Sequence, residues 1–153
     1  MRVASWKLLL AAAIVTAAVL TVVGPDHAGL QMAADADAFR AKLTHPGREL
    51  AAALIDVGFA ASYGLLGIVG YRMTTFRSSI KRFAIALVAL GALCDEIENM
   101  FLVRNITERR TLSDGWVDAM KVPGTLKWIG SPALLVLMVW AIGRAVRRAR
   151  AVR

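Results

Sequence analysis

The chain has 153 residues, enough for one domain, and 58% of them are hydrophobic. This is too apolar for an ordinary soluble domain, yet the formal net charge is +8. The charge lies in blocks between apolar runs, which is typical of an integral membrane protein with basic loops and argues against a nucleic-acid partner. The single cysteine, Cys94, excludes an intramolecular disulfide.

Four apolar segments predict four membrane-spanning helices, at about 5–23, 50–71, 83–103 and 124–143, followed by a basic tail over 144–153. Each segment approaches or exceeds the roughly 20 residues that cross a bilayer as a helix. Since a helix satisfies its own backbone in lipid, we expect an all-α fold, a four-helix transmembrane bundle that forms one domain over 1–153. The first segment could instead be a signal peptide, but Val22 to Pro25 make a poor cleavage site, so we favour a retained helix.

The first long connection predicts a short amphipathic helix outside the membrane. Met32, Ala36, Phe39 and Leu43 recur at helical spacing and would form its apolar face, either on the membrane surface or capping the bundle. Pro46 then suits the first turn of the second span. In the fourth segment, Pro132 cannot donate to the Trp128 carbonyl, which predicts a kink that opens the outer end.

Basic residues predict the orientation. The N-terminus, the connection between the second and third spans and the tail carry Lys and Arg but no acid, whereas the other two connections mix both signs. The positive-inside rule therefore places both termini in the cytoplasm, and we expect an integral protein of a bacterial cytoplasmic membrane. Asn105-Ile106-Thr107 matches a glycosylation sequon, but it lies against the end of a span and we interpret it as coincidence.

Polar residues interrupt the third span in an ordered way. At 100° per residue, Asp95, Glu96, Glu98 and Asn99 share an arc of about 160°, which should face protein or water and not lipid. The predicted topology brings Asp56 of the second span and Lys127 of the fourth to a similar depth, in the outer half of the bilayer. The candidate site therefore consists of Asp56, Tyr63, Asp95, Glu96, Glu98, Asn99 and Lys127.

This pattern leaves several functions open. The cluster either joins the helices or binds an amphipathic ligand or lipid. As a membrane enzyme, the protein would use Asp95 and Glu98 as an acid/base pair on a lipophilic substrate, oriented by Asp56 or Asn99. As a transporter, it would use the carboxylates as a proton or cation site. The sequence assigns no catalytic residue and indicates no metal or cofactor. The partners expected are membrane lipids, an amphipathic small molecule or a second membrane subunit.

Overall fold

The computed structural model describes residues 11, 14–15, 18–19 and 27–151, and within them every element is helical and no strand occurs. In chain order these are α2 (His27–Gln31), α3 (Ala36–Lys42), α4 (Pro46–Arg72), α5 (Ser78–Thr107), α6 (Asp114–Leu126), the 3-10 helix η1 (Lys127–Gly130) and α7 (Ser131–Ala151). The predicted all-α class is therefore confirmed. The span predicted at 5–23 lies outside the described residues, apart from five isolated helical positions.

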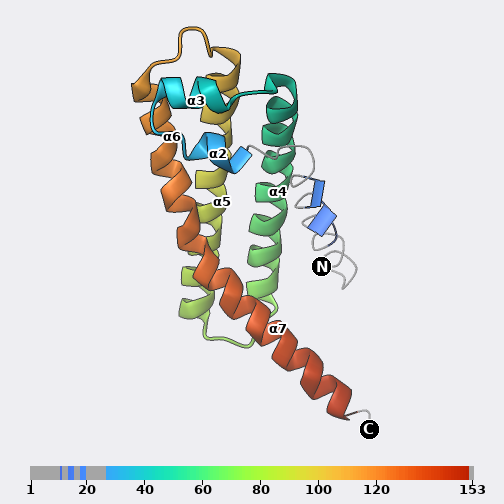
Figure 1. Cartoon of the computed structure of the whole chain (residues 1–153). Coiled ribbons are helices and arrows are strands. Elements are labelled where there is room, and N and C mark those ends of the chain that lie inside the picture. The colour runs from blue at the N-terminus through green and yellow to red at the C-terminus, as the bar shows by residue number, and fades with distance from the viewer. Residues whose placement is uncertain (1–10, 12–13, 16–17, 20–26, 152–153) are drawn as a thin grey trace.

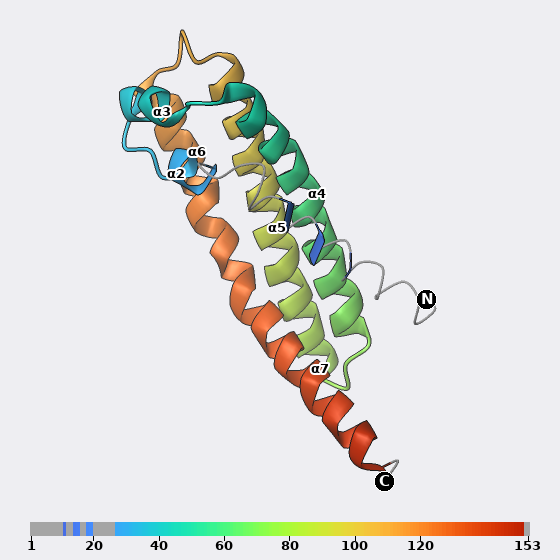
Figure 2. The same cartoon turned by 45° about the vertical axis from the view of Figure 1, so that its right-hand side comes forward.

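Two long helices and one continuous helical rod form most of the described part of the chain. Helices α4 and α5 run antiparallel side by side, and α6, η1 and α7 form the rod that crosses them (Figures 1 and 2). Short helices α2 and α3 lie at the end where α5 passes into α6, which we call the cap end. The opposite end holds the α4–α5 connection, and we call it the basic end.

The boundaries of two predicted spans need only small corrections. Helix α4 begins at Pro46, which occupies the first helical turn as expected, and it ends at Arg72. Helix α5 extends beyond the predicted 83–103 at both ends, to Ser78 and Thr107. Polar residues at either end can continue a helix although they do not belong to its apolar segment. The apolar segment alone therefore underestimates the length of α5.

The fourth span differs more from its prediction at 124–143. The rod begins at Asp114 and continues to Ala151, so it includes both the preceding connection and most of the basic tail. Val117, Met120 and Pro123 form the buried face of α6, and their packing against α5 extends the helix through a segment whose composition is that of a loop.

At Pro132 the sequence predicted a kink that opens the outer end of the fourth span, but α6 and η1 both pack against α5. The chain tightens into the 3-10 turn η1 just before this proline, and the Ser131 N–H donates to the Trp128 carbonyl. That bond satisfies the carbonyl that proline leaves without an α-helical donor. The proline therefore coincides with a tighter turn of the rod, and η1 packs directly against α5.

The amphipathic helix predicted in the first connection is present but begins later. Asp35 caps α3 by accepting from the Ala38 N–H at 2.7 Å, so the helix starts at Ala36 and excludes Met32, which is 80% exposed. The predicted positions Phe39 and Leu43 are buried, as is Ala36. Of the two expected arrangements, α3 adopts the one that caps the bundle, because this face joins a core formed with α5 and α6 (Leu102, Ile106, Val117 and Met120).

Helix α4 and the rod from Asp114 to Arg144 are each long and apolar enough to cross a membrane. Only 33% of the apolar stretch of α4 and 17% of that of the rod is buried within the molecule. Helix α5 is not one of these two helices, and its apolar stretch contains the carboxylates Asp95, Glu96 and Glu98.

Candidate functional site

Lys127 is the centre of the candidate site. Its Nζ lies 3.0 Å from Asp95 Oδ1 and 2.6 Å from Glu98 Oε2, so one ammonium group pairs with two carboxylates of α5. The three side chains are largely withdrawn from solvent, with 17% of Lys127, 6% of Asp95 and 2% of Glu98 exposed. The pairing joins the rod to α5, and removal of either partner would leave a buried charge unpaired, which is costly.

Tyr63 connects the third element, α4, to these ion pairs. Its hydroxyl donates to Asp95 Oδ2 at 3.1 Å, while Lys127 takes the other oxygen of the same carboxylate. Tyr63, Asp95, Glu98 and Lys127 thus form what we call the charge cluster, which spans α4, α5 and η1. Asp95 lies within one turn of the midpoint of α5, so the charge cluster is near the middle of the bundle's length.

Glycines allow the charge cluster to form by letting backbones approach. A Cβ on Gly91 would lie 2.8 Å from the Lys127 carbonyl oxygen, and one on Gly130 would lie 3.0 Å from the Leu87 carbonyl oxygen. Both distances are shorter than ordinary contacts and involve backbone atoms, which cannot rotate away. A Cβ on Gly124 would lie 2.5 Å from Glu98 Oε1. The rod therefore packs closely enough on α5 for Lys127 to reach both carboxylates.

The other predicted site residues lie around the charge cluster. Asp56 and Asn99 are buried, with 6% and 0% exposed, and Glu96 is half-buried. Asp56 lies on α4, seven residues before Tyr63 and therefore on the same face of that helix. Neither amide atom of Asn99 has a hydrogen-bond partner among the described residues. Such an orphan amide is unusual in a folded protein.

Sequence reasoning missed two buried polar residues nearer the cap end. Glu49 in the first turn of α4 is 1% exposed, and Asn105 near the end of α5 is fully buried. Asn105 donates to the Met120 sulfur at 3.8 Å, so the apparent glycosylation site is part of a helix–helix contact. Helical spacing was the available signal, since Glu49 lies seven residues before Asp56 and Asn105 lies seven after Glu98, and residues seven apart share a helix face.

Arg104 lies on the same helix as Asp95 and Glu98 but has partners outside the charge cluster. Its Nε pairs with Glu108 Oε2 at 3.0 Å, and its guanidinium lies 3.4 Å from the centroid of the Trp116 ring. This cation–π contact draws Arg104 toward the surface of the cap end. Within the described part of the chain, Lys127 is therefore the cation that the structure pairs with Asp95 and Glu98.

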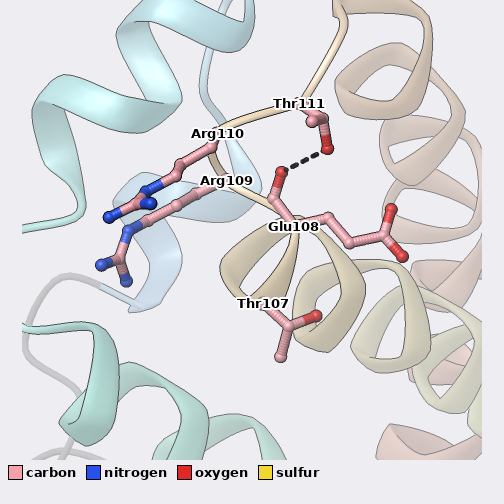
Figure 3. A pocket seen from close by; sticks show the side chains of 5 residues that line it. All are labelled: Thr107, Glu108, Arg109, Arg110 and Thr111. Carbon is pink, nitrogen blue, oxygen red and sulfur yellow. Dashed lines mark hydrogen bonds between the residues drawn. The ribbon is translucent and has the colours of Figure 1, made fainter.

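A surface hollow of about 400 Å³ lies elsewhere, in the turn that follows α5 (Figure 3). It is lined by Thr107, Glu108, Arg109, Arg110 and Thr111, all exposed, and begins more than two turns beyond Glu98. The Thr111 hydroxyl donates to the Glu108 carbonyl, and the two arginine side chains extend together away from the Glu108 carboxylate. The hollow has no contact with the charge cluster and no buried polar group.

The chemistry available to the charge cluster is the holding of charge and the exchange of protons. In the described segments, His, Cys, Asp and Glu side chains form no group of three suited to a metal ion. Two carboxylates that share one ammonium, with a phenol on one of them, can pass a proton between neighbouring groups. They can equally serve only to join three helices.

Comparison with known proteins adds no assignment to this geometry. No protein-family model, no curated protein and no solved structure matches the chain.

Proposed function

We propose that this chain is a small integral membrane protein with four helical spans and both termini in the cytoplasm, and that its charge cluster holds the spans together. The apolar side chains on the outside of the long helices support a lipid environment, because a soluble protein of this size rarely exposes so many. They include Leu54 and Leu65 on α4, Leu93 and Met100 on α5, and Leu135, Val139 and Ile142 on α7, each at least 45% exposed.

The observation that carries the proposal is the pairing of Lys127 with both Asp95 and Glu98. Charges within a bilayer are costly, and proteins keep them where partners are available. Here one cation on the rod joins two anions on α5, and Tyr63 adds α4. In the proposed orientation the charge cluster lies in the outer half of the bilayer, close to its middle. It would fix the register of three helices that apolar surfaces alone leave free to slide.

Binding of an amphipathic ligand or lipid at the same place is the second candidate. Asn99 favours it, since its fully buried amide has no hydrogen-bond partner among the described residues and is suited to a guest that both donates and accepts hydrogen bonds. The carboxylates also outnumber Lys127, which favours a guest or proton that reduces negative charge. Acid/base catalysis on a lipophilic substrate and proton-coupled transport would use these same groups.

Membrane topology is tested by labelling introduced cysteines in a Cys94→Ala background. We expect a cysteine at Ser113, between α5 and α6, to react with an impermeant thiol reagent in intact cells. A cysteine at Thr75, in the α4–α5 connection, is the matched control and should react only after permeabilisation. Both positions are exposed. The reverse pattern would invert the orientation, and release of the protein from membranes by alkaline carbonate would refute the integral membrane assignment.

Two variants separate joining from binding. Asp95→Asn combined with Glu98→Gln should lower the folded yield if the charge cluster joins helices. Asn99→Leu removes only the orphan amide, so a purely structural role predicts unchanged or higher stability. Loss of a co-purified molecule from folded Asn99→Leu protein, measured by mass spectrometry, would establish the binding role. Asn105→Leu on the same helix is the control, since Asn105 is equally buried but lies farther from the charge cluster, toward the cap end, and donates to the Met120 sulfur.

A further inference from the structure

Six basic residues gather at the basic end of the bundle, and no described acid forms an ion pair with them. They are Arg72, Arg77, Lys81 and Arg82 around the α4–α5 connection, and Arg144 and Arg147 on α7. The sequence contains no Asp or Glu between Val57 and Cys94, and none after Ala119. No described acidic side chain pairs with these six residues, so anionic groups in the surroundings of the protein can neutralise them.

Tertiary contacts bring these two segments together. Arg144 donates from one guanidinium nitrogen to the Met73 carbonyl at 3.5 Å, and its guanidinium lies 5.3 Å from the centroid of the Trp140 ring. Trp140 in turn packs against Phe76, with 6.3 Å between ring centroids. In both views α7 passes beside the α4–α5 connection and continues beyond it (Figures 1 and 2). Basic and aromatic side chains thus share one surface.

The cap end provides the contrast. There Arg40 pairs with Asp37 at 2.6 Å, Arg104 with Glu108 at 3.0 Å and Lys121 with Asp118 at 2.7 Å. No described acid pairs with a basic residue at the other end of the bundle. The two ends therefore differ in net charge, and they also differ in whether acidic side chains of the protein pair with the basic ones.

We propose that the basic end binds the headgroup of an anionic phospholipid, with Arg77 and Arg144 at the phosphate and with Phe76 and Trp140 against the acyl chains. The inference rests on the proposed membrane location. Clustered Lys and Arg beside membrane helices attract anionic lipids, by about 1 kcal/mol for each charge near the surface. The half-buried aromatic pair favours a lipid over free phosphate, because free phosphate has no apolar part to cover those rings.

The test titrates the purified full-length protein in neutral detergent with phosphatidylglycerol or phosphatidylcholine and measures occupancy by native mass spectrometry. We expect tighter binding of phosphatidylglycerol, and about 30-fold weaker binding of it by the Arg77→Gln, Arg144→Gln double variant. Arg109→Gln with Arg110→Gln is the matched control. It removes the same charge at the cap end, from the hollow in Figure 3, and should change the affinity less than two-fold. Arg77→Gln alone, at an exposed position, should weaken binding about five-fold, which keeps the proposal testable if replacing Arg144 disturbs the fold.

Each outcome decides the inference. Equal affinity for the two lipids, or equal losses in the two double variants, would overturn it even if carbonate extraction leaves the protein in the membrane. Displacement of phosphatidylglycerol by equimolar glycerol phosphate would identify a soluble phosphate site and overturn it as well. Release of the protein by carbonate would overturn the membrane proposal and this inference together.

Discussion

Replacing Lys127 by methionine should be among the most destabilising single changes on the rod. Methionine keeps most of the side-chain volume but removes the ammonium that lies 3.0 Å from Asp95 and 2.6 Å from Glu98. Two buried carboxylates would then face each other without a cation. Removing one partner of a buried ion pair typically costs about 3–5 kcal/mol, and we expect a loss of that size in the free energy of unfolding.

Lys121→Met is the matched control on the same rod. Lys121 also forms an ion pair, at 2.7 Å from Asp118, but the two side chains are 37% and 65% exposed. Solvent screens such a pair, so its loss should cost about 1 kcal/mol or less. Unfolding of the purified proteins by a denaturing detergent, followed by circular dichroism, compares the two. Adding Asp95→Asn and Glu98→Gln to Lys127→Met should recover much of the loss, because no unpaired charge remains.

Equal effects of the two lysine substitutions would refute the reasoning. It would mean that the buried ion pairs contribute no more than a solvated surface pair. Failure of the triple variant to recover stability would show that Lys127 acts through its packing and not through its charge.

Two further predictions concern backbone approach and the cap. Gly91→Ala should cost about 1–3 kcal/mol, because its Cβ would meet the Lys127 carbonyl at 2.8 Å, whereas Gly58→Ala, with nothing within 4 Å, should be neutral or stabilising in the same unfolding assay. Phe39→Ala should cost about 3–5 kcal/mol and speed proteolysis of the cap, since Phe39 is fully buried, and Met32→Ala should change neither. A neutral Phe39→Ala would show that α3 is not part of the cooperative core.

Helix existence was predictable from local pattern, and helix ends only partly so. Apolar runs indicated α4, α5 and α7 because each run is long enough, and in α5 the polar residues that interrupt it keep to one side of the helix. The start of α3 was misplaced because the apolar spacing counted Met32, whereas the Asp35 cap begins the helix after it. The first part of the rod, α6, escaped prediction because its composition is that of a loop, and only its packing against α5 shows why it is helical.

The polar face of α5 was predictable because 3.6 residues per turn place Asp95, Glu98 and Asn99 on one side. Their individual partners were not predictable. Tyr63 donates to Asp95, whereas Asn99 has no hydrogen-bond partner in the part of the chain that the structure describes. Such choices depend on side-chain rotamers and on helix register to within one residue.

By itself the sequence determined that the chain is helical, apolar outside and charged at intervals, because periodicity and composition act along a single helix. Only the tertiary structure decided that Lys127 forms ion pairs with both Asp95 and Glu98. That outcome requires Gly91 and Gly130 to bring two backbones into contact, and a distance between helices is not encoded in the spacing along either one.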